Sequence, residues 1–240
     1  MTNLIAAVRS VLTYIVVSLY VLIAGPIALA LAVGLKNKTA LYGPGHLGVG
    51  LALGLAGIRY RVHHRERVPR DRAVVFCSNH ESNVDPPVLF QALHQRLHVL
   101  FKAELTKLPV LGAVMIAGGF VPVERDRREA SMVSIERAAE SIRAGNSFLI
   151  FPEGTRSRTA ELLPFKKGGF IMAIKAQAPI VPVAVSGGRA AMRKGSWVVR
   201  PVMVDVTIGD PVETKGMSLD DRDRLIEIVR TRIEELRHNK

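Results

Sequence analysis

The chain has 240 residues, of which 48% are hydrophobic and 22% charged, and its formal net charge is +12. This composition excludes a disordered or fibrous protein. The single cysteine, Cys77, excludes an internal disulfide, and no Cys/His cluster offers a structural zinc site. The positive charge by itself fits a partner made of nucleic acid, anionic lipid or a phosphorylated substrate.

Residues 1–58 are predicted to anchor the chain in a membrane as a helical hairpin. Between Arg9 and Lys36 lie 26 residues without an acid or a base, which as a helix are about 39 Å long, against a hydrocarbon core of about 30 Å. A second uncharged stretch follows Lys38. We expect Gly43-Pro44-Gly45 to break its start, so that its helix covers only His46 to Ile58.

Two geometries of this anchor stay open. One is a spanning helix followed by a shallow one, and the other, which we favour, is a re-entrant pair in one leaflet with a bend at Gly25-Pro26. A cleaved signal peptide is disfavoured because its apolar region is normally about 7–15 residues long. Five arginines between Arg59 and Arg70 indicate contact with anionic lipid, although a solvated loop also accommodates them.

Residues 59–240 are predicted to form one domain of the α/β class, with a mostly parallel sheet flanked by helices. Short apolar or β-branched runs indicate strands at 73–78, 98–102, 120–123, 147–151, 180–186 and 198–208. Helical patterns lie between them at 87–95, 128–144 and 168–177. A last amphipathic helix, which we expect to dock on the core, follows Ser218-x-x-Asp221, a relative of the capping box.

The first motif that carries chemistry runs from Asn79 to Pro87, directly after a predicted strand. His80 and Asp85 are five residues apart and would point away from each other on one helix. Because Pro86 disfavours the helical conformation at Asp85, we expect a loop that ends at a helix N-terminus and folds the carboxylate back onto the imidazole. Such a pair leaves one ring nitrogen free to act as a general base. A helix cap and a buried histidine are the structural alternatives.

Three further motifs follow in the chain. Phe151-Pro152-Glu153-Gly154-Thr155-Arg156-Ser157 comes after a predicted strand, where ligands of open α/β sheets collect. The segment 165–169, Phe-Lys-Lys-Gly-Gly, opens a helix and could hold phosphate. Gly119 to Asp126 ends a strand in a charged run, in which Arg125 could grip phosphate or simply face solvent. The segment 178–183, Ala-Pro-Ile-Val-Pro-Val, is interpreted as a strand that is entered through prolines and has a structural role.

The order of these motifs resembles that of the glycerolipid acyltransferases. H-x4-D is followed by Gly-Phe-Val-x-Val-x-Arg, then Phe-Pro-Glu-Gly-Thr-Arg-Ser, then Ile-Val-Pro-Val. The resemblance covers about residues 59–210 by motif and residues 1–58 by architecture, and it is greatest to the members that acylate lysophosphatidate. It implies transfer of a fatty acyl group from acyl-CoA or acyl-carrier protein to the sn-2 hydroxyl of 1-acyl-glycerol 3-phosphate, which forms phosphatidate.

The same resemblance implies roles for individual residues. His80 would be the catalytic base and Asp85 its orienting catalytic partner. Substrate would be bound by Lys102, Arg125, Glu153, Gly154, Thr155 and Arg156, of which Lys102 would contact phosphate or the thioester oxyanion. No metal and no cofactor are implied beyond the acyl donor as co-substrate. The partners would be membrane lipids, with no nucleic acid, and the catalytic domain would lie on the cytoplasmic face.

Alternatives from the same and from other classes stay open. An acyltransferase could act on glycerol 3-phosphate, another lysophospholipid or a lyso-aminolipid. A non-catalytic, membrane-bound protein that binds anionic lipid or nucleic acid would also be basic, but aromatic residues are only 5% of this chain, few for base stacking. A serine hydrolase is disfavoured because no nucleophile elbow such as GxSxG occurs.

Overall fold

The computed structural model describes residues 3–93, 96–124, 128–159 and 161–238. Two helices, α1 (Asn3–Gly34) and α2 (Tyr42–Ala56), precede an α/β domain in which strands and helices alternate. Its strands are β1 (Ile58–His63), β2 (Val75–Ser78), β3 (Leu97–Lys102), β4 (Val121–Val123), β5 (Ser147–Ile150), β6 (Ile180–Ser186) and β7 (Val202–Ile208). Its helices are α3 (Asp85–Ala92), α4 (Leu111–Ala117), α5 (Arg128–Arg143), α6 (Gly168–Ala176), α7 (Gly188–Ala191) and α8 (Arg222–His238).

The strands form one mixed sheet with the order β1-β7-β6-β2-β5-β3-β4. The five strands from β6 to β4 are parallel to their neighbours, whereas β7 runs antiparallel to β6 and carries β1 parallel to itself. The mostly parallel α/β fold predicted from the alternation of strands and helices is therefore confirmed. Because β2, β5 and β6 are parallel, the loops that follow them emerge at the same edge of the sheet.

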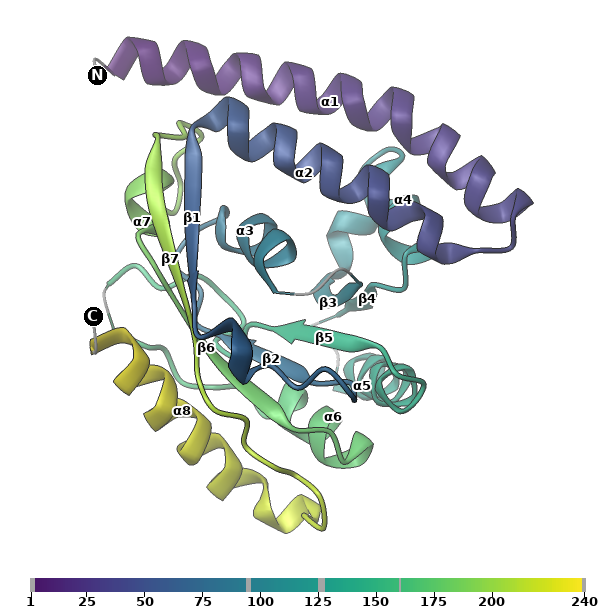
Figure 1. Cartoon of the computed structure of the whole chain (residues 1–240), viewed down its shortest axis with the longest axis vertical. Helices are drawn as coiled ribbons and strands as arrows, with labels where there is room; N and C mark the ends of the chain where they lie inside the picture. The colour runs from purple at the N-terminus through teal and green to yellow at the C-terminus, as the bar shows by residue number, and fades with distance from the viewer. Residues whose placement is uncertain (1–2, 94–95, 125–127, 160, 239–240) are drawn as a thin grey trace.

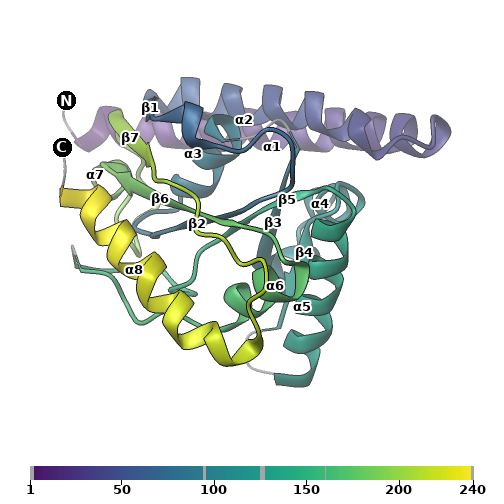
Figure 2. The same ribbon diagram turned by 60° about the horizontal axis from the view of Figure 1, so that its bottom comes forward.

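Helices cover both faces of the sheet. Phe76 of β2 points into a layer that contains Val88 and Leu89 of α3, while the next residue, Cys77, points into the opposite layer. That second layer is formed by α5, α6 and α8 (Figures 1 and 2). A strand with both faces buried explains why Val75, Phe76 and Cys77 of β2 form a continuous apolar run rather than an alternating pattern.

The N-terminal hairpin differs from expectation at the start of its second helix. α1 continues through Gly25-Pro26 without ending, and the chain reverses after Gly34, where Lys36 has a positive φ of 49°. Gly43-Pro44-Gly45 does not delay α2, which begins at Tyr42. Pro44 lies in the first turn of α2, where its missing N–H would have had no intrahelical acceptor.

The long helix α1 lies on the outside of the molecule, beside α2 (Figure 1). Among the described residues, it is the helix that is long and apolar enough to cross a membrane by length and composition. Its exposed large apolar side chains extend over its whole length: Leu4, Ile5, Val8, Val11, Leu12, Ile15, Leu19, Leu22, Ile23, Ile27, Leu31 and Val33. A face of this size is typical of contact with a membrane or another protein.

The arginine cluster after α2 contains a strand that the sequence analysis missed. Arg59 and Arg61 lie on β1, an edge strand that carries the chain away from the hairpin (Figure 1). Farther along, Arg67 forms an ion pair with Asp210 at 3.4 Å. The cluster is thus divided between β1, which carries Arg59 and Arg61, and the turn at Arg65–Arg67 with the segment after it.

Most other element boundaries agree with the sequence within about two residues, except that β7 begins at Val202 rather than at residue 198. The capping box is present, with Ser218 and Asp221 satisfying each other's backbone N–H groups before α8. Leu225, Val229 and Ile233 of α8 are fully buried. The predicted docking of this helix on the core is therefore confirmed.

Candidate active site

His80 and Asp85 meet in the loop between β2 and α3, at the carboxyl edge of the sheet. Nδ1 of His80 lies 3.0 Å from Oδ2 of Asp85. Asp85 is the first residue of α3, and Pro86 and Pro87 follow it in the first turn, so the loop closes as the sequence predicted. The His80 ring stacks on Phe151 with a centroid distance of 4.2 Å. With Nδ1 directed at the carboxylate, Nε2 is the ring nitrogen left for chemistry.

The Asp85 carboxylate is fully buried and held by the backbone of its own loop. Oδ2 accepts hydrogen bonds from the amides of Glu81 and Ser82, each at 2.7 Å, in addition to its contact with His80. Oδ1 has no hydrogen-bond partner among the described residues. It faces Gly188 of α7 so closely that a Cβ built there would overlap it. The carboxylate is therefore fixed by three donors on one side and by a bare glycine on the other.

Glu153 joins the loop after β5 to the histidine loop. Its Oε1 accepts from the His80 amide at 2.8 Å, and its Oε2 accepts from the Leu163 amide at 3.0 Å. Burial raises the pKa of this carboxyl above its usual value, against the lowering effect of the two amide hydrogen bonds. The Ser157 amide donates to the His80 carbonyl at 2.8 Å, so the two loops are tied together on both sides of His80.

Gly154, Thr155 and Arg156 form the turn that follows Glu153. Gly154 has a φ of +67°, and a Cβ on it would lie 2.7 Å from Cε of Lys166, so a side chain is excluded by both conformation and space. Nζ of Lys194 donates to Oγ1 of Thr155 at 3.1 Å and to the Arg156 carbonyl at 3.0 Å. Nη1 of Arg156 is buried and has no hydrogen-bond partner among the described residues.

The two other predicted substrate-binding residues lie apart from this group. Lys102 ends β3, two strands from β2, which is roughly 10 Å at the usual strand spacing. Its exposed side chain pairs with Glu104 at 2.9 Å. Arg125 lies outside the described residues. The structure thus brings together His80, Asp85, Glu153, Gly154, Thr155 and Arg156, and places Lys102 at the periphery.

Several residues that hold the site were not singled out from the sequence. The Asn79 side chain makes two hydrogen bonds to the backbone of Val185 in β6, at 2.7 and 2.9 Å. Arg237 of α8 pairs with Glu81 at 3.4 Å, and burial together with the Asp85 charge raises the pKa of Glu81. These contacts bring β6 and α8 to the histidine loop. The sequence signal that could have identified such residues is a polar residue or a glycine directly after a predicted strand.

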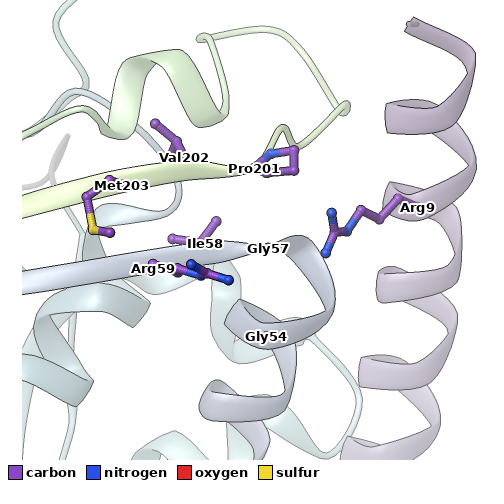
Figure 3. Close-up of a pocket in the computed structure, with 8 residues that line it drawn as sticks. All are labelled: Arg9, Gly54, Gly57, Ile58, Arg59, Pro201, Val202 and Met203. Carbon is purple, nitrogen blue, oxygen red and sulfur yellow. The ribbon is translucent and has the colours of Figure 1, made fainter. Parts of the chain in front are cut away.

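A cavity of about 510 Å³ lies at the same edge of the sheet, beside the start of β1 and β7. It is lined by Arg9 of α1 and Arg59 of β1, and Arg9 reaches across to Gly57 at the end of α2 (Figure 3). Nε of Arg9 donates to the Leu55 carbonyl at 2.6 Å. In the part of the chain that the structure describes, no group of three or more His, Cys, Asp or Glu side chains could hold a metal ion.

Comparison with known proteins identifies the class of protein to which this α/β fold, with its His–Asp pair at the carboxyl edge, belongs. A profile of the Acyltransferase family matches residues 59–186. A 1-acyl-sn-glycerol-3-phosphate acyltransferase of Limnanthes douglasii is 31% identical over 77% of this chain and 66% of its own length. The beta form of the human enzyme is 33% identical over 71% of this chain and 62% of its own length.

Similarity to a solved structure extends over the whole chain. The crystal structure of the lysophosphatidate acyltransferase PlsC from Thermotoga maritima has a TM-score of 0.84 and 25% sequence identity, with 100% of this chain and 99% of that chain covered. The chain therefore belongs to the acyltransferase family. It spans slightly less than two-thirds of the length of the first curated relatives that it matches.

Proposed function

We propose that the protein transfers a fatty acyl group from a coenzyme A or carrier-protein thioester to the sn-2 hydroxyl of 1-acyl-glycerol 3-phosphate and so forms phosphatidate. The observation that carries the proposal is the His80–Asp85 pair, with its free ring nitrogen beside the Glu153–Arg156 turn. The curated relatives and the solved structure named for this activity support the choice of acceptor.

In the proposed reaction His80 is the general base. Nε2 takes the proton from the acceptor hydroxyl as its oxygen attacks the thioester carbonyl carbon. When the carbon–sulfur bond breaks, the imidazolium returns the proton to the departing thiolate. Asp85 holds the ring in the required tautomer and stabilises the imidazolium, because its Oδ2 lies 3.0 Å from Nδ1 and cannot turn away from its two amide donors.

The buried nitrogen of Arg156 supports a phosphate site beside this base. A guanidinium N–H without a partner is costly when it is buried, and the phosphate of the acceptor would satisfy it with a charge-assisted hydrogen bond. Lys194 fixes the backbone of the same turn. Glu153 uses both carboxylate oxygens on backbone amides, so we assign it to positioning His80 and the turn rather than to contact with the acceptor.

Lys102 and Arg125 stay predictions for the binding of substrate. Lys102 lies two strands from the base. At this distance it is better placed to contact an anionic group of the acyl donor than the thioester oxygen. Both substrates are anionic, and the net charge of +12 favours their approach. No step in this mechanism is assigned to a metal ion or to a resident cofactor.

We further propose that the hairpin lies in one leaflet of the membrane. α1 is held against the catalytic domain at two places along its length, through Ser10 to Val199 and through Gly25, which packs on Val110. A helix fixed along the domain in this way exposes one long apolar face sideways and does not project from the domain as a separate span. The catalytic domain would then face the cytoplasm, where both kinds of thioester donor are found.

The test is a transfer assay with purified protein in phospholipid vesicles. Labelled acyl-CoA and acyl-carrier protein are each supplied with lysophosphatidate, glycerol 3-phosphate or lysophosphatidylcholine. We expect labelled phosphatidate from lysophosphatidate with at least one donor. If only another acceptor gives product, the protein is an acyltransferase of the same family that acts on that acceptor and not on lysophosphatidate. The absence of product from every pair of donor and acceptor would refute the proposed activity.

A further inference from the structure

The loop between α7 and β7, residues 192–201, is fastened to the side of α1. The Tyr14 hydroxyl donates to the Trp197 carbonyl at 2.7 Å, and the Val199 amide donates to Oγ of Ser10 at 2.8 Å. These hydrogen bonds join segments that are more than 180 residues apart in the chain. Because the loop is attached to α1 in this way, any surface that this side of α1 contacts also lies close to the loop.

Trp197 lies on the surface of the protein at this place. It is 54% exposed, and the neighbouring Tyr14 is 41% exposed. The exposed apolar residues Val11, Leu12 and Ile15 continue from Tyr14 along the same stretch of α1. An exposed indole beside an exposed apolar helix is stabilised by an environment in which apolar groups contact the ring and a polar group accepts a hydrogen bond from its N–H. The boundary between lipid headgroups and acyl chains supplies both.

The charge of the loop selects the kind of surface. The loop contains Arg193, Lys194 and Arg200 but no acid, and Arg189 of α7 precedes it. The cavity between α1 and β1 adds the arginine side chains of its lining (Figure 3). Basic residues next to an apolar membrane contact are attracted by anionic headgroups. The surface that fits is thus an anionic bilayer.

The same loop is also tied to the candidate active site. Oγ of Ser82, which lies between His80 and Asp85, donates to the Met192 carbonyl at 2.8 Å. Lys194 holds the turn that contains Thr155 and Arg156. The loop thus connects the membrane helix at one end with both site loops at the other.

We propose that the α7–β7 loop is a second bilayer contact, in which Trp197 lies in the headgroup region of an anionic membrane. This contact holds the edge of the sheet that carries His80 at the level where lipid substrates present their headgroups. The proposal rests on the membrane attachment of α1 given under the proposed function. It adds a contact made by the catalytic domain itself.

Trp197 is the one tryptophan of the chain, so its fluorescence tests the proposal directly. The full-length protein is bound to vesicles of phosphatidylcholine and phosphatidylglycerol whose acyl chains carry bromine either near the headgroup or near the chain end. We expect a blue-shifted emission, quenching that is stronger with shallow than with deep bromine, and protection from aqueous iodide.

A matched control moves the tryptophan to the opposite side of the molecule. The double variant Trp197→Phe/Leu219→Trp places it in the turn before α8, at a residue that is 46% exposed. Helix α8 lies on the opposite side of the sheet from α1 (Figures 1 and 2). Its emission should be quenched by iodide and not by brominated lipid.

Vesicle flotation separates the failure of this proposal from the failure of membrane attachment. Protein that floats with the vesicles while Trp197 is quenched by iodide and not by bromine would overturn the loop contact alone and leave the loop free for water or a protein partner. Protein that does not float overturns both. Because the readout is independent of acyl transfer, an inactive preparation still tests the loop.

Discussion

Replacing Gly188 by alanine should damage the active site without touching a reacting group. A Cβ at this position would overlap Oδ1 of Asp85 and lie 3.3 Å from Cβ of Ser82. The carboxylate cannot yield freely, because Oδ2 is held by His80 and by two backbone amides. Relief of the overlap therefore requires Asp85 or α7 to move by about 1 Å, on the scale of van der Waals contact distances.

A displacement of this size at a catalytic group can lower the rate by about 10²-fold, which equals about 2.7 kcal/mol of transition-state stabilisation. Overpacking of a buried site also costs about 1–3 kcal/mol of folding free energy. We therefore expect Gly188→Ala to lower kcat about 100-fold, with a moderate fall in melting temperature and little change in KM. The assay is transfer of labelled acyl groups to lysophosphatidate in vesicles, with thermal melting measured in parallel.

Gly112→Ala is the matched control for stability. Gly112 of α4 is also buried, and its Cβ would overlap the backbone carbonyl of Thr106, away from the Asp85 loop. We expect this variant to lose stability and to keep kcat within about twofold, since the overlap lies outside the two loops that hold His80. If Gly188→Ala keeps nearly full activity, or if both variants lose activity in proportion to stability, the claim that Gly188 positions Asp85 is wrong.

Three further predictions concern the base, the phosphate site and the core. Asp85→Asn should lower kcat by about 10²–10⁴ at an unchanged acceptor KM, because the amide cannot stabilise the imidazolium; steady-state kinetics would contradict this if KM alone changed. Arg156→Gln should raise KM about 10–100-fold for lysophosphatidate, the worth of a charged hydrogen bond, but not for monoacylglycerol, and an equal effect on both acceptors would exclude a phosphate contact. Burial lowers the pKa of His98 to about 4 from 6.5. The contribution of neutral His98 to folding stability is therefore fully present above pH 6.5, and the free energy of unfolding falls by up to about 3 kcal/mol between pH 6.5 and 4. The melting temperatures of the protein and of His98→Gln should diverge over this pH range, and melting temperatures that fall in parallel would show that His98 is not the cause.

The motif spacing predicted the geometry around His80 because its constraints are local. Pro86 and Pro87 restrict the backbone at Asp85 and suit the first turn of a helix, so the position of the carboxylate followed from nine consecutive residues. The strands around it could be predicted for a related reason. They are buried on both faces and appear as short continuous apolar runs.

Other parts of the molecule depend on contacts that no local pattern reveals. β1 was missed because it is an edge strand whose arginines are exposed, with Ile58 as its one buried residue among Ile58–His63. Gly188 and Asn79 carry no chemistry by themselves. Their roles exist only because β6 pairs with β2 and brings Val185 and α7 to the histidine loop. The start of α2 was misjudged because Gly43-Pro44-Gly45 was treated as a break, although a proline suits the first turn of a helix.

The central claim is that the free nitrogen of His80 removes the proton from the acceptor hydroxyl. The most direct test is acyl transfer to lysophosphatidate by His80→Ala, measured in vesicles against the unaltered protein, with vesicle flotation and melting temperature as controls for attachment and folding. The account predicts that the variant binds and folds normally and that kcat falls by at least about 10²–10⁴. A folded, membrane-bound variant that retains its transfer rate would contradict it.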